Sequence, residues 1–205
     1  MARVGRPKAY DDGLRVRLVE AAARLLADEG AGAVTTRRVA SEVGTSTTAI
    51  YSLIGSKQEL FRAMHREGFD RLAHHLAEVA PDADPIDHIA ALGLAYHAMA
   101  VESPHLYHVM FDTSWSQLEP DAADRALARG TLDVLVDAVR RAVEAGELVG
   151  DPNDLALELW SLNHGITSLG LSGMLGSPAE VRRRVASAGR ALRAGHAPER
   201  SRPRA

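Results

Sequence analysis

The residues best suited to binding chemistry lie in one stretch, TTRRVASEVGTSTTAIYSLIGSKQEL, which runs from Thr35 to Leu60. Within it, residues 45–48 are Thr-Ser-Thr-Thr, and these short hydroxyl side chains can donate and accept hydrogen bonds at base edges and phosphates. Tyr51 is long enough to reach a phosphate, and Arg37 can make a bidentate contact with guanine. Ser and Thr also cap helices, so the residue types alone leave open a DNA-reading surface and a packed corner.

The same stretch contains the elements that would position these side chains. Residues 39–43 and 49–54 each carry apolar side chains at the spacing of one buried helical face, and Gly44 follows the first set. Two short helices joined by such a turn are typical of a helix-turn-helix, whose second helix enters the major groove with its N-terminal residues. We expect Thr36 to cap the first helix. The expected DNA contacts are Thr35, Thr36, Arg37, Thr45, Ser46, Thr47, Thr48, Tyr51, Ser52 and Lys57.

Helical periodicity continues along the rest of the chain, with no convincing alternating strand. Pro and Asp cluster at residues 81–85 and mark a domain boundary. Asp151 before Pro152, and Ser177 three residues before Glu180, predict the starts of the last two helices. The sequence therefore predicts an all-α fold of about nine helices, with a three-helix head and a larger helical domain.

The sequence predicts four segments. They are a flexible basic arm (1–11), a DNA-binding domain (12–72, with the helix-turn-helix at about 35–54), a ligand-binding and dimerisation domain (85–195) and a disordered basic tail (196–205). The arm, with Arg3, Arg6 and Lys8, could enter a minor groove or serve as a solubilising tail.

Composition places the chain among globular proteins. It has 205 residues, of which 46% are apolar, which is enough for one or two domains with a sizeable core. The absence of Cys excludes disulfides and thiolate metal sites. We find no run of about 18 uncharged apolar residues, and the charged N-terminus lacks the apolar core of a signal peptide. These features predict a cytoplasmic protein with no membrane partner.

Charge is distributed unevenly along the chain. Residues 1–66 contain 11 Lys and Arg against 7 Asp and Glu, residues 67–180 contain 5 against 19, and residues 181–205 contain 8 against 1. A basic head on an acidic body suits a protein that presents one end to a polyanion. Alternatively, these charged blocks only form solvated faces and bind no polyanion.

The segment 18–60 resembles the tetracycline-repressor (TetR) family of transcriptional regulators. The spacing from Gly44 through residues 50–51 to residues 56–57 is far more specific than a bare helix-turn-helix. The other positions that carry the resemblance are Ala21, Ala22, Leu25, Leu26, Gly30, Thr35, Thr36, Val39, Ala40, Val43, Ser46 and Leu60.

This resemblance implies that the first residues of both short helices contact DNA, together with Tyr51 and Lys57. Leu53 and Ile54 depart from the family, which usually has aromatic residues at these two positions. Leu53 therefore lacks the polar or stacking contact of an aromatic residue or His, while Ile54 can still fill the core.

The second half of the chain, about residues 85–190, resembles the C-terminal domain of one TetR subgroup. Trp160, His164 and Gly165 match its Trp–His–Gly signature, which implies a dimerising, ligand-sensing domain. Trp160 and His164 share one helical face, and Gly165 would allow the close approach of a helix or ligand. The expected lining of a mostly apolar pocket is Tyr96, His97, Met99, Tyr107, Met110, Phe111, Trp115, Trp160 and His164. Plain core packing is the alternative.

Catalytic and metal chemistry find little support in the sequence. His105 and His108 are three residues apart, but they have neither Cys nor a placed carboxylate beside them. His164 with Ser161 or Ser168 lacks an orienting acid and a strand-to-helix elbow. We therefore expect no enzyme activity, no metal and no cofactor.

The sequence thus predicts a homodimeric, ligand-released repressor that binds a near-palindromic double-stranded operator. The expected interface is a four-helix bundle formed by Leu155, Leu159, Leu162, Ile166, Leu169, Val181, Val185 and Leu192. An apolar or amphipathic effector that fits the pocket better when the heads are splayed would lower DNA affinity. The alternatives are a repressor or activator with a filled core and no effector, and an enzyme on a helical scaffold.

Overall fold

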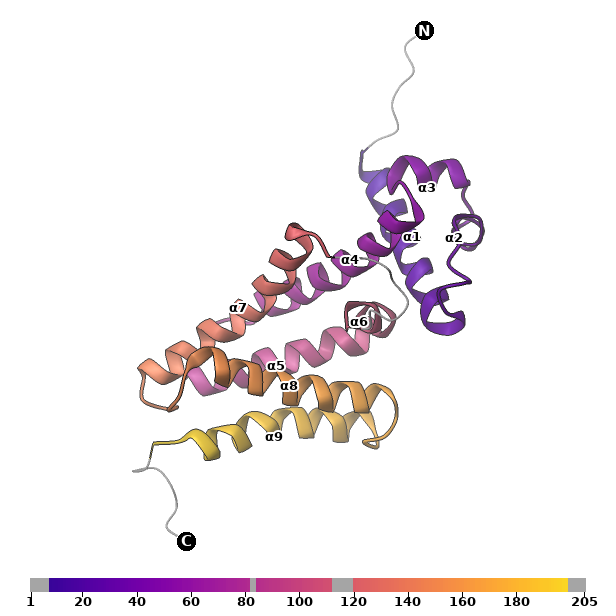
Figure 1. Ribbon diagram of the computed structural model, residues 1–205. Helices are drawn as coiled ribbons and strands as arrows, with labels where there is room; N and C mark the ends of the chain where they lie inside the picture. Colours follow the sequence, from indigo (N-terminus) through magenta and orange to yellow (C-terminus); the bar gives the residue numbers. More distant parts are fainter. Residues whose placement is uncertain (1–7, 82–83, 112–119, 199–205) are drawn as a thin grey trace. The chain divides into compact units, whose positions relative to one another are not determined.

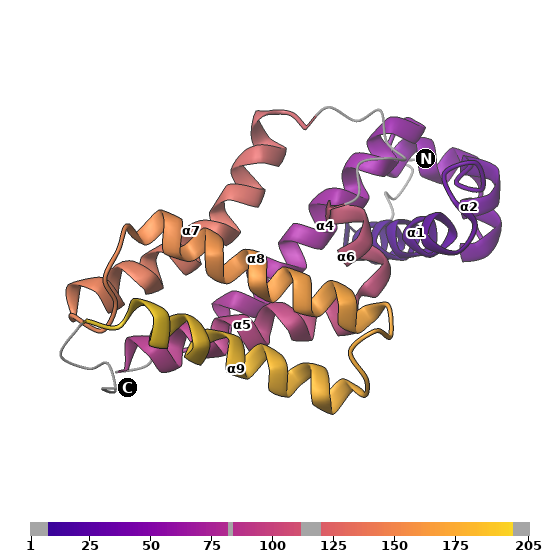
Figure 2. The same ribbon diagram turned by 60° about the horizontal axis from the view of Figure 1, so that its bottom comes forward.

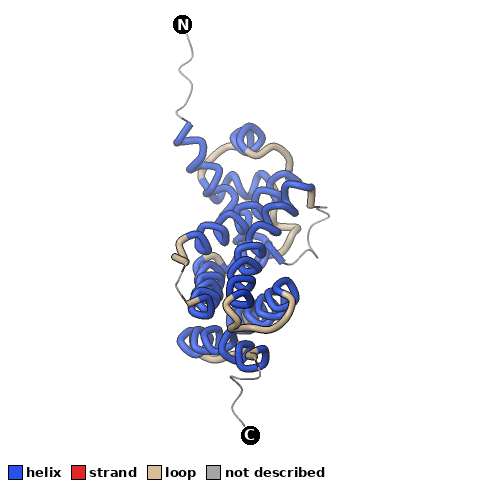
Figure 3. The backbone as a smooth tube through the Cα atoms, turned by 90° about the vertical axis from the view of Figure 1, so that its left-hand side faces the viewer, coloured by secondary structure: helices blue, strands red, loops and turns tan. Residues whose placement is uncertain are grey.

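The computed structural model describes residues 8–81, 84–111 and 120–198, and these residues form helices and turns with no strand among them (Figure 3). This confirms the predicted all-α fold. None of the helices in the described segments is long and apolar enough to cross a membrane. The nine helices found there are, in chain order (Figure 1), α1 (Lys8–Glu29), α2 (Thr36–Val43), α3 (Thr47–Leu53), α4 (Lys57–Ala77), α5 (Pro85–Glu102), α6 (Pro104–Phe111), α7 (Ala122–Glu144), α8 (Pro152–Leu171) and α9 (Pro178–His196).

The helices are divided between two compact units. The first unit comprises residues up to 69 and residues 105–125, and the second comprises residues 70–104 and those from 126 onward. The boundaries fall inside α4 and α7, so each of these helices contributes to both units. The head unit therefore includes α6 and the start of α7, whereas the sequence predicts that residues 105–125 belong to the C-terminal domain.

The first unit is built around an apolar core that α1 shares with the helix-turn-helix. Leu18, Val39 and Ile50, one from each of the first three helices, have no exposed surface. Leu53 and Ile54 are partly buried and pack against this core, so these aliphatic residues fill space where the family usually has aromatics. Further buried residues come from α4 and α6, namely Leu60, Phe61, Ala63, Met64, Leu106 and Val109.

Close contact between α4 and α6 depends on a glycine in α4. A Cβ atom added at Gly68 would lie 2.5 Å from Cγ of Met110 in α6, so any other residue would force the side chain of Met110 to move. Beside this contact, Phe111 packs its ring against Phe69 and Tyr107, with centroid separations of 6.0 and 5.2 Å. The small residue lets α6 approach α4, and the aromatic rings fill the space around it.

The second unit is a layered arrangement in which α5, α8 and α9 pack against one another (Figure 2). A Cβ atom at Gly170 of α8 would lie 2.5 Å from Cγ1 of Val181 in α9, so this glycine allows the two helices to approach closely. Both helices begin as predicted. Asp151 caps α8 by accepting the backbone N–H groups of residues 153 and 154, and Ser177 and Glu180 form a reciprocal capping box at α9.

Candidate nucleic-acid interface

The start of α3 is fixed by Ser46, whose Oγ accepts the backbone N–H of Ala49 at 3.2 Å. Ile50 anchors the helix in the core. Around this anchor, the side chains of Thr48, Tyr51 and Ser52 are exposed, and Tyr51 keeps 59% of its surface in solvent. Thr45 and Thr47 are half-buried. The predicted contact residues of α3 therefore lie at its N-terminal end and on its exposed side.

The start of α2 is capped by Thr35, so the predicted cap at Thr36 is wrong by one residue. Thr35 has an extended backbone, and its Oγ1 accepts the N–H of Arg38 at 3.2 Å. Thr36 is instead the first helical residue and is half-buried. The helix ends at Gly44, whose φ of 70° lies in the left-handed region that glycine adopts without strain.

The two adjacent arginines of α2 have different environments. Arg38 donates to both carboxylate oxygens of Glu29, at 2.8 and 3.2 Å, and to Glu42 at 3.5 Å. The two bonds to Glu29 tie α2 to the end of α1. Arg37 is exposed, and among the described residues its guanidinium has no hydrogen-bond or ion-pair partner. Arg37 is therefore the arginine of α2 that remains available to a nucleic acid.

Lys57 lies at the start of α4, where its position is set by two contacts within the head. Its Nζ donates to the carbonyl of Ala31 at 3.2 Å and lies 5.6 Å from the ring centroid of Phe61. The side chain remains exposed. A cation held in this way at a helix N-terminus is suited to binding a phosphate. Its link to the turn before α2 also connects α4 to the helix-turn-helix.

Polar side chains of α5 and α8 meet inside the second unit. Tyr96 Oη lies 2.8 Å from His164 Nδ1, and His97 Nδ1 lies 3.3 Å from Thr167 Oγ1. Burial lowers the pKa of His164, and burial together with the charge of Arg182 lowers the pKa of His97. Both imidazoles are therefore neutral at pH 7, and they act as hydrogen-bonding rather than charged groups.

The residues predicted to line one pocket are distributed over both units. Tyr96, His97, Met99, Trp160 and His164 belong to the second unit, where the rings of Trp160 and His164 are 5.7 Å apart. Tyr96 and Met99 are buried there. The predicted residues of the first unit are Tyr107, Met110 and Phe111, of which the first two are buried. Trp115 lies outside the described residues.

Burial separates the predicted dimer contacts into two groups. Leu155, Leu159, Val181 and Val185 are 2–7% exposed and pack in the core of the single chain, which leaves little of their surface for a partner. Their apolar spacing marked the inner side of α8 and α9. Leu162 and Leu169 remain 41% and 44% exposed, and Ile166 is half-buried. The side chain of Leu192 lies outside the description.

One polar cluster of the first unit is not predicted from the sequence. Arg62 and Arg66 of α4 bind Asp121 and Asp124 at the start of α7. The sequence does contain a local signal, because Asp at a cap position followed three residues later by another acid is typical of a helix start. It contains nothing that pairs this start with α4. Within the described segments, no group of three or more His, Asp and Glu side chains could hold a metal ion.

Family comparisons agree with this geometry. Residues 18–64 match the family model described as bacterial regulatory proteins of the tetR family, and residues 89–193, just over half of the chain, match that of a tetracyclin repressor-like C-terminal domain. The chain belongs to the TetR family. The first match covers the helix-turn-helix, and the second runs from within α5 to within α9, so it includes α6 and the start of α7. Membership of the Trp–His–Gly subgroup remains a prediction.

Three similar proteins illustrate the extent of the resemblance. The HTH-type transcriptional regulator Rv1816 of Mycobacterium tuberculosis is 23% identical over 150 residues, which cover 71% of this chain and only 64% of Rv1816. A bacterial regulatory protein in the tetR family from Rhodococcus RHA1 is 26% identical, with a TM-score of 0.73 over 87% of this chain and 96% of that one. AibR, solved in complex with isovaleryl coenzyme A and operator DNA, is 18% identical, with a TM-score of 0.69 over 85% of this chain and 96% of AibR. At that identity, the AibR match shows a shared fold alone.

Proposed function

We propose that this TetR-family protein is a sequence-specific transcriptional regulator that binds a near-palindromic operator as a homodimer. The observation that carries the proposal is the exposed side of α3. Thr48, Tyr51 and Ser52 project from a short helix that Ser46 caps and Ile50 anchors. A rigid helix that exposes hydroxyl groups along one side, beginning at Thr48 near its N-terminus, is what a major groove accommodates.

Arg37 also supports the proposal, because its exposed guanidinium can form a bidentate hydrogen bond with guanine. Selection of bound sites from a random double-stranded DNA pool tests the proposal with the wild type, Arg37→Ala and Arg38→Ala. Arg38→Ala is the matched control, since this neighbouring arginine is already occupied by Glu29. We expect a palindromic site with the wild type and with the control. Arg37→Ala should lose about 1–3 kcal/mol of discrimination at one base pair in each half-site.

Two outcomes of this experiment would count against the proposal. Binding that enriches no sequence and weakens steeply with salt would be nonspecific phosphate binding. The exposed side of α3 would then not be a reading surface. An equal loss of selectivity in Arg37→Ala and Arg38→Ala would reject a reading role for Arg37 and leave only a requirement for basic charge.

The second unit is proposed to sense a small molecule with an apolar body and a polar group. Support comes from the neutral His164, which is bonded to Tyr96 and lies beside the indole of Trp160. The structure of AibR contains isovaleryl coenzyme A, so acyl-coenzyme A compounds are the first class to screen. A compound that raises the thermal transition and also releases operator DNA would identify the effector class.

A regulator without an effector is the second candidate, and burial of the predicted pocket residues favours it. Tyr96, Met99, Tyr107 and Met110 are all at most 6% exposed. Side chains packed in this way are typical of a filled core. If no compound in a screen of apolar and amphipathic molecules alters either stability or DNA release, this second candidate is preferred.

A homodimer is proposed to form through the outer side of α8 and α9. Leu162 and Leu169 lie on one side of α8, seven residues apart, and remain exposed in the single chain. Gly165, between them, has open space around it, because a Cβ atom there would meet nothing within 4 Å. An open small residue flanked by exposed leucines suits close packing by a helix of a second copy.

A further inference from the structure

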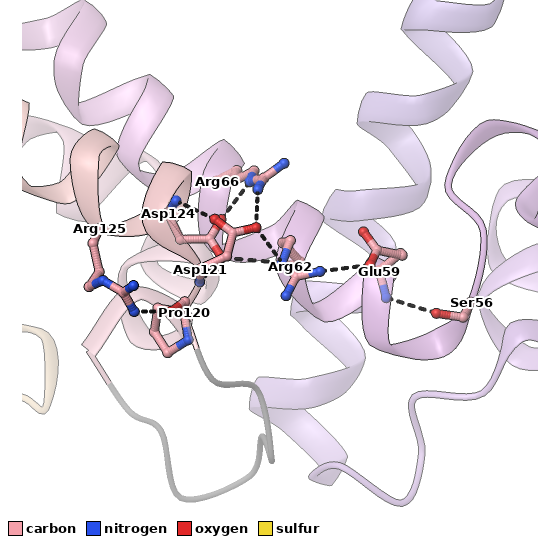
Figure 4. Close-up of polar contacts among 8 residues, drawn as sticks. All are labelled: Ser56, Glu59, Arg62, Arg66, Pro120, Asp121, Asp124 and Arg125. Atoms are coloured by element: carbon pink, nitrogen blue, oxygen red, sulfur yellow. Dashed lines mark hydrogen bonds and ion pairs between the residues drawn. The ribbon is translucent and has the colours of Figure 1, made fainter.

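Four charged side chains join α4 to the start of α7 within the first unit (Figure 4). Asp124 has no exposed surface. Its Oδ1 accepts Nε of Arg66 at 2.6 Å, and its Oδ2 accepts Nε of Arg62 at 3.2 Å. Arg66 also donates to Oδ2 of Asp121 at 3.0 Å. We call Arg62, Arg66, Asp121 and Asp124 the α4–α7 latch.

The two aspartates of the latch also hold each other in place through the backbone. The N–H of Asp121 donates to Oδ2 of Asp124 at 3.0 Å, and the N–H of Asp124 donates to Oδ1 of Asp121 at 2.8 Å. Burial acts to raise the pKa of Asp124, but hydrogen bonds from Arg66, the backbone of Asp121 and Arg62 outweigh it and hold the pKa below its ordinary value. Asp124 is therefore an ionised, fully bonded carboxylate.

Burial distinguishes the latch from the other ion pairs of the head. Arg38 and Glu29 are both nearly half exposed, and exposed pairs of this kind contribute little to stability. A buried carboxylate is different, because separating it from its partners leaves an uncompensated charge. The start of α7 therefore remains bound to α4 as long as both arginines are in place.

A continuous series of contacts runs from the latch to the DNA-binding residues. Arg62 also binds Glu59 at 2.7 Å, and the N–H of Glu59 donates to Ser56 Oγ at 3.1 Å (Figure 4). Lys57 follows Ser56, and its Nζ binds the carbonyl of Ala31 in the turn before α2. Fixing α4 at Arg62 and Arg66 thus also fixes the turn that presents Lys57.

We propose that Asp124 is a positioning residue for DNA binding, which acts through Arg62 and Arg66 on the first turns of α4. This inference rests on the proposed function, because operator affinity is its main readout. Beyond residue 125, α7 continues into the second unit.

The test measures the affinity of the full-length protein for its selected operator in the wild type, Asp124→Asn and Asp133→Asn. Asp133 is an exposed acid farther along α7, so its substitution removes the same charge outside the latch. Removing a negative charge should strengthen binding to a polyanion if only net charge matters. We expect Asp124→Asn instead to weaken binding about tenfold, and Asp133→Asn to leave it within about twofold.

A second set of variants separates positioning from a general loss of structure. Arg66→Gln should weaken operator binding. The Asp124→Asn/Arg66→Gln double variant should have an operator affinity no lower than that of the single variant with the lower affinity, because both substitutions act through one contact. Arg66→Lys, which retains the charge and a donor, should recover part of the affinity. All variants are compared at a temperature where their helix content equals that of the wild type. Additive losses, or wild-type affinity in Asp124→Asn, would overturn the proposal.

Hydrogen exchange keeps the latch testable if no operator is found. Asp124→Asn should accelerate amide exchange both in residues 57–66 of α4 and in residues 121–125, relative to Asp133→Asn. If the wild type selects no site but exchange changes in this way, the proposed function fails while the α4–α7 connection stands. Unchanged exchange at α4 would reject the connection itself.

Discussion

Hydroxyl groups in the head serve local structure and can still serve binding. Oγ1 of Thr35 and Oγ of Ser46 each accept a backbone N–H at a helix start. A hydroxyl that accepts in this way keeps its own hydrogen for donation. Capping and DNA contact are therefore compatible roles for one residue. Ser52 differs, because its hydroxyl donates to the carbonyl of Thr48 at 3.0 Å, so its remaining role in DNA contact is that of an acceptor.

Three histidines with lowered pKa values predict how stability depends on pH. Burial is the largest cause for His65, His97 and His164. Since the unfolded chain binds protons at a higher pH than the folded chain does, stability is fully present above the unfolded pKa of about 6.5 and falls as the pH drops toward the folded values. Urea unfolding at pH 7.5 and 5.5 should show the wild type to be less stable at the lower pH.

Substitution of one histidine tests the origin of that loss. His97→Gln keeps a hydrogen-bonding side chain opposite Thr167 but cannot bind a proton. The difference in unfolding free energy between the two pH values should therefore be smaller in His97→Gln than in the wild type. His105→Gln, at a half-buried position on α6, provides the comparison. An equal pH dependence in all three proteins would exclude His97 as a contributor.

At the scale of the helices, glycines at close contacts decide which elements pack together. Gly170→Ala would place a methyl group against Val181, and such overpacking costs about 1–3 kcal/mol. Gly130 of α7 is the matched control, since a Cβ atom there meets nothing within 4 Å. Gly130→Ala should stabilise the protein by about 0.5–1 kcal/mol, because alanine favours the helix. Denaturant unfolding measures both free energies. If both variants were more stable than the wild type, or both less stable, the role given to Gly170 would be contradicted.

Local signals predicted the helices well, and contacts between helices poorly. The helix caps Asp151, Ser177 and Gly44 act on residues within one turn, so their roles could be inferred from the residues next to them in the sequence. Gly165 was expected to allow a close approach, but the glycine of α8 that does so within the single chain is Gly170. The pairing of Asp124 with Arg62 and Arg66 joins residues about sixty positions apart, and no periodicity carries that information. The exposed side of α3 was predictable because a helix-turn-helix is itself a local motif.

At the scale of the whole molecule, the proposed dimer predicts different effects for two similarly exposed leucines of α8. Leu157 and Leu162 are 44% and 41% exposed, but five residues of α-helix place them about 140° apart around the axis. Leu162→Glu should raise the dimer dissociation constant about 10- to 100-fold, because it places a charge in an apolar contact. Leu157→Glu should leave it unchanged. Sedimentation over a range of concentrations distinguishes these results, and equal effects would place the interface elsewhere.

The assignment of α6 and the start of α7 to the head unit has a consequence for recombination within the family. A chimeric regulator made by exchanging chain up to the Pro/Asp-rich segment at 81–85 would separate Leu60 and Met64 from Leu106 and Val109 of the same core. It would also separate Arg62 and Arg66 of α4 from their partners Asp121 and Asp124 at the start of α7. The transferable module of this protein is discontinuous, so its sequence specificity can be transplanted intact only together with residues 105–125.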